Sequence, residues 1–234
     1  MTDPSAFEDE HEYITLICTY CGHQVTVPVY CGNRFCNICC APRRKRVRDR
    51  LKWLIQHRKN VTGTMIKHLT LTVRNDPDLV KMTKHLIKSF RKMRNRRYWK
   101  ECVVGGAFVV ELTNKGNYWH AHLHIIIQSF RIDIKRLMSI WFQCSGGNTG
   151  VYIKNIPPAR AVWYLTKYVT KSDLDIEDQK TASEALKNFR LFNPFGQWYA
   201  INAEYKVLPS PCTKCGISGC YLPAEIIYGI WERH

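Results

Sequence analysis

The sequence lacks several features that mark large classes of protein. It contains no apolar run close to the roughly 20 residues that a membrane-spanning helix needs. Its first residues, MTDPSAFEDEHEY, are acidic and have no apolar stretch of the kind found in secretory signals. The phosphate-binding motif G-x-x-x-x-G-K-[ST] of many ATPases does not occur either. We therefore expect a soluble, cytoplasmic protein with no membrane partner and no ATP-driven motor of its own.

Acidic residues are scarce relative to basic ones. The 234 residues include 35 Lys and Arg but 19 Asp and Glu, which gives a formal net charge of +16. Such an excess attracts polyanions, above all nucleic acid. Hydrophobic residues make up 45% of the chain, which is enough for a packed core and argues against a disordered chain.

The order of patterns along the chain predicts an α+β fold with a largely antiparallel sheet. Alternating apolar residues indicate strands over 66–73, 103–114 and 117–128, the last two forming a hairpin closed by Lys115 and Gly116. Helical spacing indicates helices over 42–59, which starts at Pro42, and over 78–100, 133–142 and 158–171. We expect a disordered leader over 1–12, a zinc-binding segment with a basic helix over 13–60, a core over 61–175 and a C-terminal extension over 176–234.

Most of the eleven cysteines fall into pairs with metal-binding spacing. Two C-x2-C pairs, Cys18 with Cys21 and Cys36 with Cys39, supply the four soft ligands of a tetrahedral structural zinc site. Cys31 and Cys40 are spare thiols nearby, and either is able to replace one of the four. A further group predicts a second zinc site whose fourth ligand is unidentified: Cys212, Cys215 and Cys220.

The stretch YWHAHLHIIIQ places three histidines at alternate positions. Because side chains two apart share one face of a strand, His120, His122 and His124 project together. Glu111 on the partner strand of the hairpin is the candidate carboxylate for the same face. Two imidazoles and a carboxylate with open positions suit a hard divalent ion, Mg²⁺ or Mn²⁺. Whether His120 is a ligand is left open by the pattern.

The segment AVWYLTKYVTKSD carries two tyrosines and two lysines at helical spacing. Tyr164 and Tyr168 are one helical turn apart, as are Lys167 and Lys171. A plain amphipathic helix with buried tyrosines also has this pattern. Next to a divalent-metal site on a basic protein, however, a tyrosine hydroxyl is a nucleophile suited to a phosphodiester.

Two basic runs, PRRKRVRDR and KSFRKMRNRRYWK, indicate contact with nucleic acid. A solvated helix face is the alternative, but the runs have few compensating acids, and Tyr98 and Trp99 lie beside the arginines of the second run, where bases can stack on them. The candidate DNA-binding residues are Arg43, Arg44, Lys45, Arg46, Arg91, Arg94, Arg96 and Arg97.

Together these segments resemble the HUH endonuclease superfamily, specifically rolling-circle replication initiators. HLHIIIQ resembles the HUH motif, KHLTLTVRN the strand motif that precedes it, and YLTKYVTKSDLD the tyrosine motif in its two-tyrosine form. CGNRFCNICCAPRRKR resembles the cysteine-rich segment ahead of the nuclease core in many plasmid initiators. The resemblance extends over roughly residues 65–173 in the expected order and leaves out the last sixty residues.

The resemblance implies a five-stranded antiparallel sheet with the histidines on a central strand and the tyrosine helix across the metal. It implies that a tyrosine nicks single-stranded DNA at an origin or hairpin, forms a 5′-phosphotyrosine, frees a 3′-OH and later rejoins the strand. His122, His124 and Glu111 match the metal ligands. Tyr168 matches the principal nucleophile with Lys171, and Tyr164, which also heads a Y-x-x-K with Lys167, the second.

Such an initiator works in the host cell of a plasmid or virus with a separate helicase and the host polymerase. Two alternatives stay open. One is an HUH transposase or relaxase with the same chemistry, and the other is a non-catalytic zinc-containing protein that binds DNA or RNA. The sequence does not indicate the recognised DNA, the host or the oligomeric state.

Overall fold

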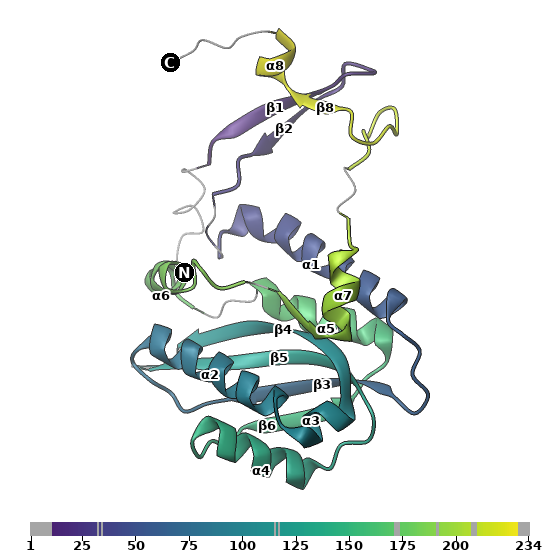
Figure 1. The fold of residues 1–234 in the computed structure, drawn as a ribbon. Helices are drawn as coiled ribbons and strands as arrows, with labels where there is room; N and C mark the ends of the chain where they lie inside the picture. The colour runs from purple at the N-terminus through teal and green to yellow at the C-terminus, as the bar shows by residue number, and fades with distance from the viewer. Residues whose placement is uncertain are drawn as a thin grey trace. The chain divides into compact units, whose positions relative to one another are not determined.

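The computed structural model describes residues 11–31, 33, 35–114, 116, 118–170, 174–190, 192–206 and 210–228. They form two compact units, shown in Figure 1. The smaller unit combines both ends of the chain, up to Ala41 and from Lys206 onward, and the larger unit is Pro42–Tyr205. This division does not follow the four consecutive segments expected from the sequence, because the two ends of the chain share a sheet.

The larger unit is built on a five-stranded antiparallel sheet, as the family resemblance implies. Its strand order is β6-β3-β5-β4-β7, so the histidine strand β5 is central. β4 and β5 form the expected hairpin, of which Lys115 lies outside the described residues. The strands are β3 (Met65–Thr72), β4 (Val103–Asn114), β5 (Trp119–Ser129), β6 (Val151–Asn155) and β7 (Asn193–Gly196).

The fifth strand, β7, comes from outside the expected core over 61–175. Two glycines of β4 make room for it. A Cβ on Gly105 would lie 2.8 Å from Cδ1 of Trp198, and one on Gly106 would lie 2.9 Å from Cζ of Phe195. Real Cβ atoms do not approach other atoms so closely, so the glycine pair lets the aromatic segment after Leu191 pack on the sheet.

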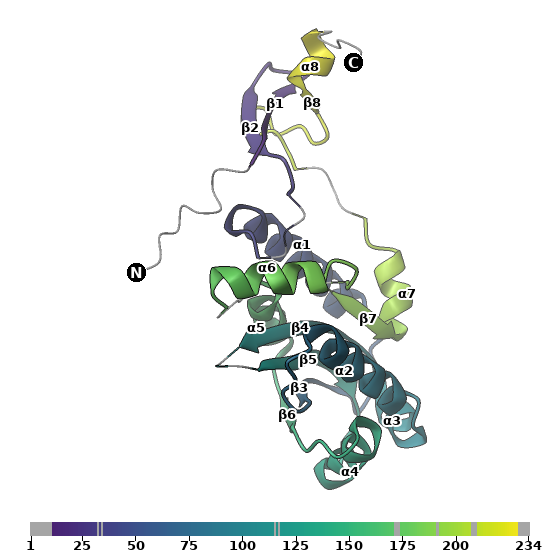
Figure 2. The ribbon, with the colours of Figure 1, turned by 90° about the vertical axis from the view of Figure 1, so that its left-hand side faces the viewer.

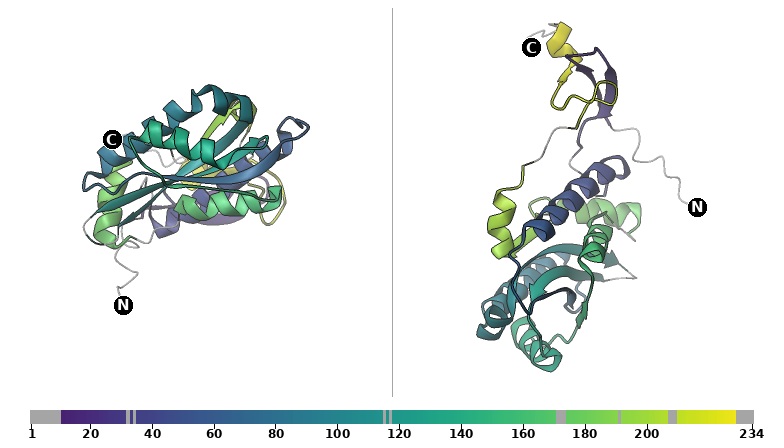
Figure 3. Two further views of the ribbon diagram at one scale, coloured as in Figure 1. Left: turned by 90° about the horizontal axis from the view of Figure 1, so that it is seen from below. Right: turned by 90° about the vertical axis from the view of Figure 1, so that its right-hand side faces the viewer.

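Helices cover both faces of this sheet (Figures 2 and 3). α1 (Asn37–His57) and α5 (Pro158–Thr170) share a hydrophobic cluster with one face. α2 (Leu79–Arg94) packs on the other face, where α4 (Ile134–Ser145) lies beside it. The remaining helices of this unit are α3 (Arg97–Cys102), α6 (Ile176–Ala185) and α7 (Gln197–Ala203). None of the helices in the described part of the chain combines the length and the apolar character that spanning a membrane requires.

Two predicted helix boundaries are wrong. The first helix begins at Asn37 rather than Pro42, and the amide of Cys40 already donates to the carbonyl of Cys36 at 2.9 Å. The predicted helix over 78–100 is two helices, because Arg96 has an extended backbone. This break turns α3 back so that Trp99 is buried, with its ring 5.6 Å from and perpendicular to that of Phe90.

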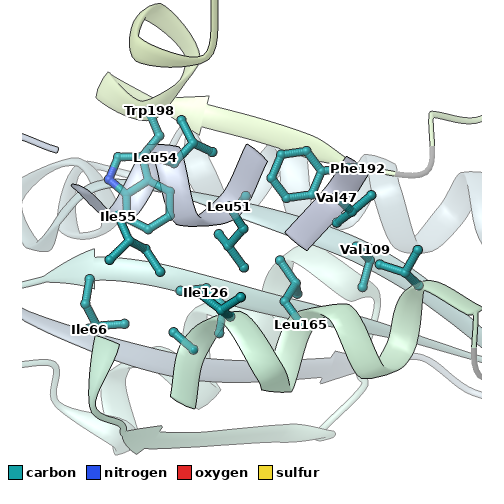
Figure 4. Close-up of a cluster of buried hydrophobic side chains, with 14 of the residues drawn as sticks. Val47, Leu51, Leu54, Ile55, Ile66, Val109, Ile126, Leu165, Phe192 and Trp198 are labelled. Atoms are coloured by element: carbon teal, nitrogen blue, oxygen red, sulfur yellow. The ribbon is translucent and has the colours of Figure 1, made fainter. Parts of the chain in front are cut away.

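The cluster beneath α1 and α5 anchors both helices on the sheet (Figure 4). Leu51 and Leu54 of α1 and Leu165 of α5 are fully buried against Val109 and Ile126 of the central strands. Burying each such leucine contributes roughly 1.5–3 kcal/mol. α5 therefore lies in a fixed position over the strands that carry the histidines.

The smaller unit contains a three-stranded sheet in the order β2-β1-β8. β1 (Tyr13–Cys18) pairs with β2 (Gln24–Pro28) and, in an antiparallel register that sets Cys18 opposite Tyr221, with β8 (Tyr221–Pro223). α8 (Ala224–Tyr228) follows β8. The pairing of β1 with β8 brings the N-terminal and C-terminal cysteines together.

Candidate functional site

The hairpin register places the candidate carboxylate and histidines on one face of the sheet. Glu111 of β4 pairs directly with His122 of β5, so their side chains share a face. Nε2 of His124 lies 2.6 Å from Oε2 of Glu111. One ligand atom from each of Glu111, His122 and His124 lies within 4.8 Å of the others. These are the three residues that the sequence analysis proposes as metal ligands.

Burial of this group favours a cation between the ligands. Glu111 is 7% exposed and His124 4%, while His122 is half-buried. A buried carboxylate is costly unless it is paired with a positive charge or binds a metal. Two imidazoles and one carboxylate at this spacing therefore fit a divalent ion.

His120 lies beside this group rather than in it. Its Nδ1 is 3.3 Å from Nε2 of His122, and burial lowers its pKa. The atoms that converge within 4.8 Å do not include any of His120. The structure thus brings together three of the four residues considered as ligands.

A fourth histidine, His68 of β3, supports His124 from the other side. Nε2 of His68 lies 3.4 Å from Nδ1 of His124, and both side chains are 4% exposed. Burial, followed by the positive charges that His124 and Lys154 can carry, lowers the pKa of His68 to about 4. At neutral pH this ring is uncharged and orients the imidazole of His124 through its hydrogen bond.

α5 places both tyrosines over this face. The ring of Tyr168 stacks on that of His124, with centroids 3.4 Å apart and planes 2° from parallel. The ring of Tyr164 stacks on His68 at 5.2 Å. The inner face of the helix thus carries both phenols directly above the histidines, as the resemblance implies.

A lysine from the sheet hydrogen-bonds to one of these phenols. Nζ of Lys154 in β6 donates to Oη of Tyr164 at 2.6 Å. This hydrogen bond lowers the pKa of Tyr164 and raises that of Lys154. A cation at this distance stabilises the phenolate, which is the nucleophilic form.

Sequence reasoning missed both His68 and Lys154. His68 belongs to the strand expected over 66–73, and Lys154 belongs to the segment GVYIKNI, which is also typical of a short strand. Lys154 pairs with His68 across β6 and β3, while Thr70 of β3 pairs with His124. The sequence indicates both strands, but it does not indicate that β3 pairs with β6.

Of the two lysines predicted to assist the tyrosines, Lys167 lies within the described residues and Lys171 does not. Nζ of Lys167 is exposed and lies 5.5 Å from the ring centroid of Trp163 and 5.7 Å from that of Tyr168.

The cysteines group only partly as predicted. Cys212, Cys215 and Cys220 lie together as expected, and one ligand atom from each lies within 4.8 Å of the others and of that of Cys18. Cys18 and Cys21, here called the N-terminal knuckle, lie beside Cys212 and Cys215, the C-terminal knuckle, and not beside Cys36 and Cys39. Sγ of Cys18 is 3.7 Å from that of Cys215, and Sγ of Cys21 is 3.7 Å from that of Cys212. Cys220 is a fifth thiol of this group, 3.2 Å from Cys18.

The two knuckles have the same backbone turn. Each is followed by a glycine with positive φ, Gly22 at 68° and Gly216 at 74°. The glycine amides donate to the carbonyls of Cys18 at 2.9 Å and Cys212 at 2.8 Å. Two matching turns that face each other with four sulfurs have the arrangement that a tetrahedral zinc ion requires.

The second pair, Cys36 and Cys39, combines with two residues that were not in the predicted set. Nε2 of His11 is 3.3 Å from the sulfurs of both cysteines, and Cys31 is 3.7 Å from Cys39. Cys31 was recognised as a substitute ligand, whereas His11 falls in the expected disordered leader, whose first ten residues are not described. Three thiols and one imidazole also fit zinc.

The two basic runs lie on opposite faces of the sheet and do not form one surface. Arg43 is buried, 8% exposed, and Arg94 is half-buried against the rings of Phe90 and Phe195, so neither is an open DNA contact. Because a helix turns once every 3.6 residues, only some side chains of a continuous charged run face the solvent. The exposed candidates are Arg44, Lys45, Arg46, Arg91, Arg96 and Arg97.

Residues 23–131 match a family described as replication protein. The matched segment includes Glu111, His122 and His124 and ends before α5, so it does not bear on the tyrosines. The chain matches no curated protein and no solved structure. The family match confirms the resemblance to rolling-circle replication initiators.

Proposed function

We propose that this replication initiator nicks and rejoins single-stranded DNA at its origin through a tyrosine of α5. The observation that carries the proposal is the position of two phenols over a buried His-His-Glu group. A plain amphipathic helix does not require a His-His-Glu group beneath its tyrosines. A structural histidine cluster does not require two phenols above it. The strong positive charge supports DNA as the substrate.

In the proposed reaction a phenol loses its proton and its oxygen attacks the scissile phosphorus. The bond from phosphorus to O3′ breaks, and O3′ takes up a proton to become the free 3′-OH. The 5′-phosphate stays on the tyrosine, and the reverse reaction rejoins the strand. A divalent ion held by Glu111, His122 and His124 would supply the positive charge that polarises the phosphate.

Tyr168 is proposed as the principal nucleophile, because it heads the Y-x-x-K motif and stacks on His124. Tyr164 is proposed as the second tyrosine, which accepts the strand at the end of a round. Lys154 lowers its pKa and keeps its oxygen oriented. Each phenol thus has its own contact with the histidine face.

Zinc is proposed for both cysteine groups of the smaller unit. All the ligands there are thiolates or one imidazole, so no position stays open for substrate, and the role is structural. The hard-ligand group of the larger unit differs in that it contains a carboxylate.

The test is an adduct assay. Labelled single-stranded oligonucleotides from the chain's own replicon are incubated with protein and Mn²⁺ and separated in SDS. We expect a covalent adduct that Tyr168→Phe reduces strongly and that the double variant with Tyr164→Phe abolishes. An adduct that persists in Tyr168→Phe but disappears in Tyr164→Phe would reverse the two assignments.

No adduct on any cognate strand, with metal bound, would contradict the proposal and favour a non-catalytic zinc-containing nucleic-acid-binding protein. A transposase or relaxase would give the same adduct. An origin hairpin next to the gene supports the initiator, whereas flanking insertion ends support the transposase.

A further inference from the structure

A groove of about 810 Å³ runs between α1 and α5, on the outer side of the tyrosine helix. Its floor is apolar and contains Ile55, Val162 and Pro158. Its walls carry polar and basic side chains from both helices. Arg44, a candidate DNA-binding residue, and Lys167 of the tyrosine helix line this groove, but the proposed nicking reaction gives the groove itself no role.

The α1 wall is a regular row of cations. Arg44, Arg48 and Lys52 are spaced four residues apart and all line the groove, and all three are exposed. Three positions on this row span about 12 Å along the helix at 1.5 Å per residue.

The charge of the groove is uniformly positive. None of the described residues that line it is acidic, and Lys167 adds a fourth cation from α5. The carboxylate of Asp49 lies 3.6 Å from Nε of Arg48, and both side chains are partly exposed. An exposed pair of this kind is weak, so Arg48 keeps its attraction for an anion.

The α5 wall presents an aromatic face. Trp163 is 59% exposed, which is unusual for a residue with so much apolar surface. Nζ of Lys167 lies 5.5 Å from the centroid of the Trp163 ring. The ring of Tyr164 packs edge-on against that of Trp163, with 5.3 Å between their centroids. An exposed indole beside a cation is a platform on which a base stacks.

The groove adjoins the catalytic face through α5 itself. Trp163 precedes Tyr164, and Lys167 lies near both the ring of Trp163 and that of Tyr168. A strand attached to a tyrosine therefore needs only to cross the helix to reach the groove. The distance is one helix diameter, about 10–12 Å.

We propose that this groove binds a short single-stranded DNA segment next to the scissile phosphate. Its phosphates contact Arg44, Arg48 and Lys52, and one base stacks on Trp163. The inference rests on the proposed function for the identity of the strand. The proposal gives α1 a role in holding the phosphates of the strand, which the nicking reaction alone does not require.

The test measures binding apart from nicking. Affinity for a labelled single-stranded oligonucleotide is measured by anisotropy over a range of salt in the double variant Tyr164→Phe, Tyr168→Phe. Converting Arg44, Arg48 and Lys52 to Gln removes three phosphate contacts and should reduce the slope of log affinity against log salt by about 2. Trp163→Ala should weaken binding on the order of tenfold with the slope unchanged, and Trp163→Phe should restore part of it.

The matched control removes the same charge from the opposite face of the sheet. Lys81 and Lys84 of α2 and Lys135 of α4 are exposed and lie outside both basic runs, and their conversion to Gln should leave the salt slope unchanged. Equal effects of the two triple variants, or an unaltered affinity in Trp163→Ala, would overturn the inference. Because the altered side chains are exposed, the thermal unfolding midpoint should stay the same.

The adduct assay on the native chain separates this inference from the proposed function. Adduct formation together with groove variants that bind normally would refute the groove alone. Absence of any adduct together with weakened binding in the groove variants would refute the nicking function and leave the groove as a DNA site.

Discussion

The grouping of the cysteines leads to a prediction about zinc content. In the structure the N-terminal and C-terminal knuckles lie together with Cys220, and Cys36 and Cys39 lie together with His11 and Cys31. In the grouping read from the sequence, the N-terminal knuckle shares a site with Cys36 and Cys39. Variants that replace two pairs of cysteines at once distinguish the two arrangements. If the two pairs bind the same zinc ion, one zinc ion is lost, and if they bind different ions, both are lost.

The distances in the structure support the knuckle-to-knuckle site quantitatively. A zinc–sulfur bond of about 2.3 Å implies about 3.8 Å between sulfurs at the corners of a tetrahedron. Both measured distances across the knuckles are 3.7 Å. Apparent zinc affinities of about 10–16 kcal/mol equal or exceed the whole stability of a typical domain, so this small unit should depend on its metal.

The assay is zinc content of purified protein, with two zinc ions per chain expected in the native sequence. Serine at both knuckles should leave one zinc, whereas serine at the N-terminal knuckle together with Cys36 and Cys39 should leave none. His11→Ala should remove one zinc. The reverse pattern for the two combined variants, or two zinc ions in His11→Ala, would refute the arrangement.

Three further predictions concern the larger unit. Lys154→Met, made in a Tyr168→Phe background, removes the cation that lowers the pKa of Tyr164. The pH profile of adduct formation should therefore move to higher pH. An unchanged pH profile would contradict the role of Lys154. Glu111→Gln should weaken Mn²⁺ binding, followed by electron paramagnetic resonance, on the order of tenfold or more, whereas His120→Ala should not; equal losses would exclude the three-residue ligand group. Gly105→Ala should lower the free energy of unfolding in urea by about 1–3 kcal/mol, because its Cβ collides with Trp198 of α7; an unchanged midpoint would argue against the packing of α7 on β4.

Local periodicity accounts for what was predictable in the site. The period of two in β5 places His122 and His124 on one face whatever the strand pairs with, and the short hairpin makes Glu111 a neighbour. The period of helix α5 likewise places Tyr164 and Tyr168 on one side. These are relations between residues close in the chain, where geometry follows from spacing.

Relations between distant segments were not predictable in this way. Lys154 reaches Tyr164 only because β6 pairs with β3, and β7 completes the sheet only because Gly105 and Gly106 leave room for it. No local pattern specifies which strand lies at which edge. Helix α1 was recognised from its spacing, but its side of the sheet, and hence the groove with α5, follows from packing.

The sequence by itself predicted the basic character of the protein, the antiparallel α+β class and the face that carries the histidines, and it supplied the proposed ligands and phenols. The tertiary structure alone decided that His68 and Lys154 join them and that the two chain ends combine their cysteines. The physical reason is that spacing sets direction within one element, whereas pairing and packing, which select among many partners, depend on the whole chain.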